Sequence, residues 1–183
     1  MQFKFVILSL ALVASTMAFP IMDNEEKGMF GGEEGREGME FLKNLSPAAK
    51  EGLIAIHNNT DLTRAAEEAA VVALFNSGEN ITPEDKASFA NIQTLAAKKG
   101  DQFTSAIDKA VADSSLTDTQ KALYTTCKEI YANKDLTIQQ TKQNIEAAIA
   151  AADKTNPGDS EAVKSLVMNT IHSQIKADKA ASA

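Results

Sequence analysis

Apolar residues recur along this chain at spacings of three and four positions, and alternation with a period of two never persists. Such spacing places apolar side chains on one face of an α-helix and leaves the opposite face polar. The pattern therefore predicts an all-α fold, a compact bundle of about seven helices. These are expected near residues 47–57, 64–76, 83–99, 101–112, 118–132, 138–152 and 160–177, with a short additional helix near 37–44.

Start and stop signals mark the ends of these helices. Ser46 and Thr82 each precede a proline, which predicts an N-cap followed by the first helical position. Thr117 and Thr137 are each followed three residues later by glutamine, a capping-box pattern. Stops are predicted at the segment Asn76-Ser77-Gly78, at Gly100 and at the segment Asn156-Pro157-Gly158.

One short phrase occurs twice, as AIHNNTDLT at residues 55–63 and as EIYANKDLT at residues 129–137. In both copies an apolar helical stripe ends, a polar turn follows and a new helix begins. Each copy with its flanks predicts an αα-hairpin. A pair of copies predicts a bundle built from two related halves and not a solenoid, for which three or more repeats are expected.

The residues of the repeated phrase have expected roles. The asparagine suits a left-handed residue that ends the first helix, and the threonine is the expected N-cap of the next helix. The leucine between them is expected in the core between the helices. These residues are Asn59, Leu62 and Thr63 in the first copy, and Asn133, Leu136 and Thr137 in the second.

The two segments around this phrase, residues 45–65 and 129–151, resemble the nematode SXP/RAL family of secreted antigens, also described as an Anisakis-allergen-like cation-binding domain family. Residues 45–168 follow the family's pattern in order: a Leu-Ser start, an apolar helix and two Asn-x-x-Leu-Thr turns with a helical stretch between them. The Trp-Ala pair that members often carry after the first turn is absent from residues 69–78. The resemblance implies a helical secreted domain, divalent-cation association and no catalysis, and it assigns no ligand residues.

The first eighteen residues predict a secretory signal peptide. Lys4 supplies the positive charge, residues 5–14 the apolar run, and residues 16–18 a small-x-small cleavage site. The apolar run is half the roughly twenty residues that span a bilayer, which disfavours the alternative of an N-terminal membrane anchor. The mature chain is expected to begin at Phe19 and to be secreted into the extracellular space.

Composition divides the rest of the chain. Residues 19–40 hold seven acids, two bases and five glycines, which predicts a flexible acidic leader. Residues 41–177 are expected to form the helical domain, and the Ala-rich residues 178–183 a frayed tail. The net charge of −7 and the scarcity of aromatic residues argue against nucleic-acid binding. An acidic leader that recruits a basic partner or cations is a functional alternative to a plain flexible leader.

Cys127 is the one cysteine, so no internal disulfide can form. Its position between Leu123 and Ile130 on an apolar stripe favours a buried small hydrophobe in a monomer. An intermolecular disulfide is the alternative.

Candidate chemistry is sparse. Residues 153–164 begin like a calcium loop but carry Pro157 at position 5 and Lys164 at position 12, where a glutamate is needed. His57 and His172 stand in no metal-spaced cluster, and no nucleotide-binding or nucleophile motif occurs. We therefore expect no enzyme, no catalytic residues and no resident cofactor. Oxygen-rich turns are expected at residues 58–61, 78–85 and 113–118, and weak binding of calcium or magnesium across two of them is the alternative.

Three glycosylation sequons begin at Asn44, Asn58 and Asn80. Proline follows the first and the third sequon, which disfavours their use. Asn58 lies in the predicted exposed turn of the repeated phrase and is the expected site.

The leading functional hypothesis is a secreted, non-enzymatic helical protein of the SXP/RAL type, with weak divalent-cation binding and an extracellular protein partner. A small secreted carrier of fatty acid or retinol is the alternative, and a surface-coat antigen is a third class. The later helices are rich in alanine and polar residues, whereas a lipid cavity needs large apolar linings.

Overall fold

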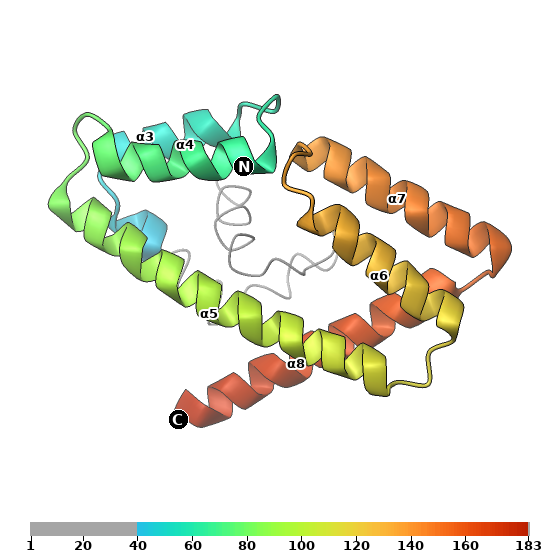
Figure 1. Ribbon diagram of the computed structural model, residues 1–183. Helices are drawn as coiled ribbons and strands as arrows, with labels where there is room; N and C mark the ends of the chain where they lie inside the picture. The colour runs from blue at the N-terminus through green and yellow to red at the C-terminus, as the bar shows by residue number, and fades with distance from the viewer. Residues whose placement is uncertain (1–39, 183) are drawn as a thin grey trace.

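A computed structural model describes residues 40–182, which are helical apart from short connections (Figure 1). Residues 40–44 form a short helical segment. No strand occurs in residues 40–182, where the one β-type contact is an isolated bridge. The all-α prediction is confirmed. The helices that follow are α3 (Pro47–His57), α4 (Arg64–Ser77), α5 (Pro83–Asp113), α6 (Asp118–Ala132), α7 (Ile138–Thr155) and α8 (Asp159–Ser182).

Side-chain caps begin five of these helices. In each, a hydroxyl oxygen accepts a hydrogen bond from the backbone N–H three residues later, which satisfies a donor that the helix itself leaves unpaired. Reciprocal capping boxes are present at Thr82, Thr117 and Thr137. The caps predicted from the sequence are therefore confirmed. The five cap residues are Ser46, Thr63, Thr82, Thr117 and Thr137.

The predicted break at Gly100 is wrong. Residues 83–99 and 101–112 belong to one continuous helix, α5, of 31 residues, with Gly100 buried in its interior. Glycine inside a helix costs only about 1 kcal/mol relative to alanine. Packing on both sides of Gly100 offsets that cost, because Phe89 and Phe103 of the same helix are buried in separate hydrophobic clusters.

The first cluster combines residues 40–45, α3, α4 and the first part of α5. Phe75 of α4 stacks on Phe89 of α5 with ring centroids 4.2 Å apart, and Phe41 contacts Phe75 at 6.2 Å. The helices α3 and α4 approach so closely that a Cβ placed at Gly52 would lie 2.6 Å from Leu74 Cδ1. The buried members are Phe41, Leu42, Leu45, Ala49, Leu53, Phe75 and Phe89.

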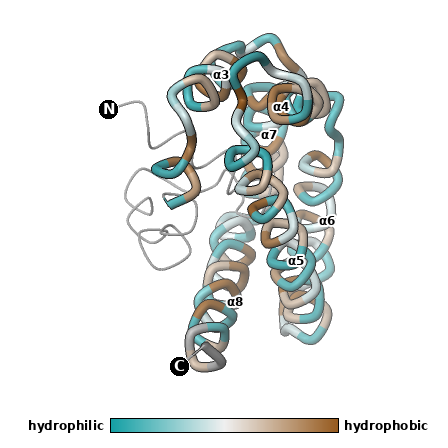
Figure 2. Tube along the Cα trace, turned by 90° about the vertical axis from the view of Figure 1, so that its left-hand side faces the viewer, coloured by the Kyte–Doolittle hydropathy of each residue, from teal (hydrophilic) through white to brown (hydrophobic). Residues whose placement is uncertain are grey.

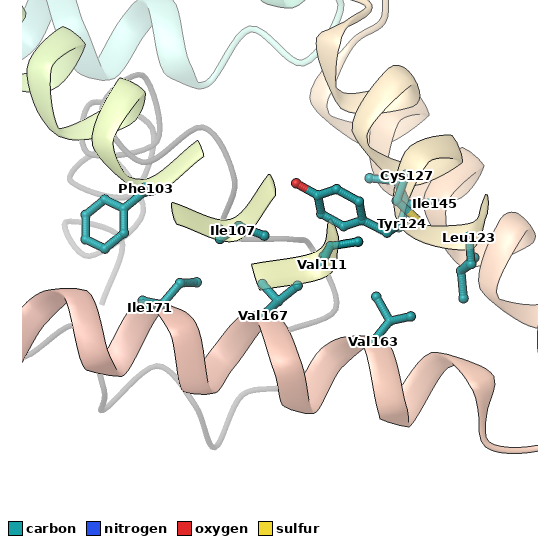
Figure 3. Packing of buried hydrophobic residues seen from close by; sticks show 10 residues of the cluster. All are labelled: Phe103, Ile107, Val111, Leu123, Tyr124, Cys127, Ile145, Val163, Val167 and Ile171. Carbon is teal, nitrogen blue, oxygen red and sulfur yellow. The ribbon is translucent and has the colours of Figure 1, made fainter. Parts of the chain in front are cut away.

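The second cluster combines the rest of α5 with α6, α7 and α8. Apolar and polar residues both recur along α8 (Figure 2). This helix packs against α5. Phe103, Ile107 and Val111 of α5 face the side chains of α8 (Figure 3). The buried members from the other helices are Leu123, Tyr124, Cys127, Ile145, Val163, Val167 and Ile171.

Two helix ends lie beyond the expected positions. α7 continues to Thr155 and α8 to Ser182, where the pattern indicated ends near 152 and 177. Fraying of residues 178–183 stays a prediction. The signal peptide (1–18) and all but the last residue of the leader (19–40) lie outside the described residues.

Candidate functional site

The two copies of the repeated phrase meet each other in space. The turn before α4 and the turn before α7 lie side by side (Figure 1), joined by an antiparallel bridge between Thr63 and Thr137. The backbone N–H of Arg64 donates to the carbonyl of Leu136 at 3.0 Å, and that of Ala65 to the carbonyl of Lys134 at 2.9 Å. We call this contact the turn junction. It links the hairpin of the first cluster to that of the second.

Equivalent Asx turns shape both sides of the turn junction. The Oδ1 atom of Asn59 accepts from the backbone N–H of Asp61 at 3.3 Å, and Oδ1 of Asn133 accepts from the N–H of Asp135 at 3.1 Å. The predicted left-handed backbone at these asparagines is wrong, since Asn80 is the sole non-glycine residue of the described range with positive φ. A short amide side chain can form the turn by itself, so the backbone does not need a left-handed residue.

The two leucines of the repeated phrase do not enter the core. Leu62 and Leu136 are half-buried at the turn junction and belong to neither cluster of buried side chains. Their predicted burial between the helices is therefore wrong. The carbonyl of Leu136 instead serves the contact between the turns, because it accepts from Arg64.

Arg64 is the buried charge of the turn junction, with 9% of its surface exposed. Its Nη1 atom donates to the backbone carbonyl of Tyr131 at the end of α6, and its guanidinium carbon lies 4.0 Å from the centroid of the Tyr131 ring. A cation is favourable both at a helix C-terminus and over an aromatic face. Burial raises the pKa of Tyr131; Arg64 opposes this shift and Glu68 adds to it.

Two acidic side chains of α4 next to the turn junction have partners. Glu67 lies 3.3 Å from Nδ1 of His57, at the end of α3, and Glu68 accepts from Nζ of Lys134 at 2.8 Å. These contacts leave the Arg64 guanidinium as the buried cationic group of the junction. His57, which stands in no metal-spaced cluster of the sequence, lies in the last turn of α3.

The described residues do not fit a preformed divalent-cation site. Among them, no group of three or more His, Cys, Asp or Glu side chains could hold a metal ion. The amide oxygens of Asn59 and Asn133 are held in Asx turns. In the rejected calcium loop, Asp153 accepts from the backbone and the hydroxyl of Ser160, so its carboxylate orders the start of α8.

A second polar group lies at the edge of the second cluster. The buried Tyr124 hydroxyl donates to Asp108 at 2.7 Å, and Nζ of Lys128 donates to the same carboxylate at 2.6 Å. Burial raises the pKa of Tyr124, and the hydrogen bond to Asp108 raises it further. The phenol therefore stays protonated at physiological pH and acts as a structural donor.

Asp85 joins the starts of α3 and α5 from a buried position. Its carboxylate accepts from the backbone and hydroxyl of Ser46, at 2.8 and 2.7 Å, and from the backbone N–H of Thr82 at 2.9 Å. Burial raises the pKa of Asp85, but the hydrogen bonds outweigh it and hold the pKa below its ordinary value. Asp159 is the equivalent of Asp85 at the spacing of the repeated phrase. It is also buried, and it accepts from Gln120, the counterpart of Ser46.

Cys127 lies in the second cluster with 1% of its surface exposed, as the predicted small buried hydrophobe. Burial raises the pKa of its thiol to about 11. Asn58, the residue predicted as a glycosylation site, is exposed at the C-cap of α3.

Comparison with known proteins gives one family. The model of the family described as "SXP/RAL-2 family protein Ani s 5-like, metal-binding domain" matches residues 1–170. No curated protein and no solved structure shows a significant match to the chain. The described helices include none with the length and apolar character to cross a membrane.

Proposed function

This chain belongs to the SXP/RAL-2 family of Ani s 5-like proteins, and from that premise we propose that it is a secreted, non-enzymatic helical protein with an extracellular interaction role. We propose further that it binds a divalent cation weakly, as an added ligand and not as part of its folded core. The observation that carries the proposal is the family match over residues 1–170, because that family is described by a metal-binding domain.

The chemistry of the described residues supports weak binding. Calcium takes about six to eight oxygen ligands, and several oxygens at the turn junction are already engaged by Arg64, Lys134 and backbone N–H groups. A cation would have to compete with those contacts, use the exposed carboxylates of Asp61 and Asp135, or use the acids of residues 19–40. Stability of the fold is therefore expected to be independent of the metal.

The alternative proposal, a small lipid carrier, has less support. A carrier needs a cavity lined by large apolar side chains. Here the buried apolar side chains of residues 40–182 pack against one another in two clusters, and Phe75 and Ile107 are almost completely enclosed. A surface-coat antigen that binds other proteins is compatible with the leading proposal and requires no cavity.

Native mass spectrometry of the mature chain, purified from a secreting host without added metal or lipid, tests these proposals. We expect a bare monomer that gains calcium, magnesium or zinc on titration. A variant with the seven acids of residues 19–40 changed to their amides locates the cation, since loss of uptake assigns it to this segment. A bound lipid mass would establish the carrier instead, and a bare monomer that takes up no metal would overturn the cation proposal.

A further inference from the structure

We propose that Asn58 carries an N-linked glycan, which covers one of the two related turns and leaves the other bare. This inference rests on the proposed secretion, because the modification takes place in the secretory pathway. It is carried by the different structural settings of the three sequons, which begin at Asn44, Asn58 and Asn80.

The sequon at Asn58 is open on the surface. Asn58, Asn59 and Thr60 are all exposed. The backbone N–H of Asn58 donates to the carbonyl of Ile54 at 3.0 Å, and Asn58 is the C-cap of α3. Within the described part of the chain, neither the side-chain amide of Asn58 nor the hydroxyl of Thr60 makes a hydrogen bond. Both groups are therefore available to a transferase without loss of a native contact.

The other two sequons use their hydroxyl groups to start helices. The hydroxyl of Ser46 donates to the buried Asp85 at 2.7 Å and caps α3. The hydroxyl of Thr82 accepts from the backbone N–H of Asp85 at 3.1 Å and caps α5. A proline follows each of these hydroxyl residues, and its ring locks its own φ in the helical range. In the folded chain these two sequons are rigid helix starts, so a transferase could then engage them only by breaking a cap.

The chemical step is a glycosyl transfer. The Nδ2 atom of Asn58 attacks the anomeric carbon of an oligosaccharide that is linked to an isoprenoid pyrophosphate. A C–N bond forms, the bond between the anomeric carbon and the pyrophosphate oxygen breaks, and the lipid pyrophosphate leaves. The amide loses one proton to a base of the transferase. No change of redox state occurs, and the hydroxyl of Thr60 identifies the acceptor asparagine.

The second turn cannot be modified in the same way. The counterpart of Asn58 in the second copy is Ala132, and the neighbouring Asn133 is followed two positions later by Asp135, where a sequon needs a hydroxyl. Oδ1 of Asn133 is also held in its Asx turn. The glycan would therefore make the two sides of the turn junction chemically unequal, with carbohydrate beside α3 and α4 and bare protein beside α6 and α7.

The test is expression of the full chain in a secreting eukaryotic cell, with its own leader and, in parallel, with residues 1–18 replaced by a proven signal peptide. Intact mass before and after treatment with peptide N-glycosidase counts the glycans. We expect one glycan, lost in Asn58→Gln and in Thr60→Ala but kept in Thr60→Ser, which preserves the hydroxyl. The matched controls Asn44→Gln and Asn80→Gln should keep it.

Two results would overturn the inference: a chain secreted by the proven signal peptide without a glycan, or a glycan that persists in Asn58→Gln. Failure of the native leader alone has a different meaning. If the chain with the proven signal peptide is glycosylated at Asn58 while the native-leader chain stays inside the cell, the site is supported and the proposed secretion is contradicted.

Discussion

At the scale of single residues, Asp85 combines deep burial with a full set of hydrogen bonds. Only 1% of the residue is exposed, and its carboxylate accepts from Ser46 and Thr82 at the starts of two helices. Local sequence predicted the caps at those two residues, because each pattern spans a few positions. It did not predict the bond between Ser46 and Asp85, which joins residues 39 positions apart.

Asp85→Asn should lower the free energy of unfolding by about 1–3 kcal/mol at pH 7, because an amide cannot accept all the bonds of the carboxylate. The pKa of Asp85 is lowered in the folded chain. Its ionised form therefore contributes stability above the unfolded pKa of about 3.9, and this contribution is lost as the pH falls through the folded pKa. Urea unfolding should thus show a gap between wild type and variant that narrows below about pH 4. The exposed Glu84→Gln is the control. An equal difference in the free energy of unfolding between wild type and Asp85→Asn at pH 7 and below about pH 4 would contradict the role of ionisation.

Cys127 gives a second prediction at this scale. A hydroxyl in the apolar second cluster loses its hydration, so Cys127→Ser should cost about 1–3 kcal/mol while the protein stays monomeric. The wild-type thiol, with a pKa raised to about 11, should react slowly with a disulfide reagent until urea unfolds the chain. Urea unfolding measures the stability, gel filtration measures the oligomeric state, and the rate of reaction with the reagent measures the accessibility of the thiol. Unchanged stability together with loss of a wild-type dimer would instead support an intermolecular disulfide.

At the scale of elements, the start of α7 was predictable because all of its signals are local. Thr137 caps the helix, and the side-chain oxygen of Gln140 accepts from the backbone N–H of Thr137 at 2.9 Å. Thr137→Ala should lower the free energy of unfolding by about 1 kcal/mol through loss of this cap. Thr126→Ala, at an exposed position inside α6, should be neutral or slightly stabilising, since alanine favours helix. Equal melting of Thr137→Ala and wild type would mean that the cap contributes nothing.

The continuity of α5 was not predictable from its local signals. Gly100 resembles a helix stop in the local sequence. The packing that keeps the helix continuous is long-range, because Phe89 and Phe103 are buried in two separate clusters. The Asx turns were missed for a related reason, because asparagine can end a helix through its backbone or through its side chain.

Hydrogen exchange can distinguish one α5 from two helices. The first four N–H groups of a helix have no intrahelical partner, so a helix that began at Asp101 would exchange rapidly at residues 101–104. In the continuous α5 these amides should be protected about as well as their neighbours. Asp118 and Thr119, in the first turn of α6, are an internal reference for unprotected amides. Rapid exchange at 101–104 would restore the break at Gly100.

At the scale of the whole molecule, the repeated phrase identifies two related turns, but their meeting depends on the packing of the entire chain. Arg64 had no signal in the sequence, since its counterpart in the second copy is Ile138 and its partner Tyr131 is 67 positions away. The division of the bundle into two related halves stays a prediction. The matching burial of the equivalent residues Asp85 and Asp159 agrees with it.

The turn junction should couple the unfolding of the two clusters, and Arg64 is its central contact. Arg64→Met removes a charged hydrogen bond and a cation–π contact from a buried position, so it should lower the free energy of unfolding by about 2–4 kcal/mol. Lys134→Met is the matched control in the same junction. Its ion pair with Glu68 is exposed to solvent, and such pairs contribute less than about 1 kcal/mol.

Urea unfolding followed by fluorescence probes placed in each cluster tests this coupling. In the wild type and in Lys134→Met, both probes should report one transition. In Arg64→Met the two transitions should separate, because only the backbone hydrogen bonds of the turn junction and the continuous helix α5 would then connect the clusters. Equal losses in the two variants would show that the turns contribute only surface electrostatics. A single shared transition in Arg64→Met would show that the Arg64 side chain does not couple the two clusters, and would leave the coupling to α5 and to the backbone bonds between the turns.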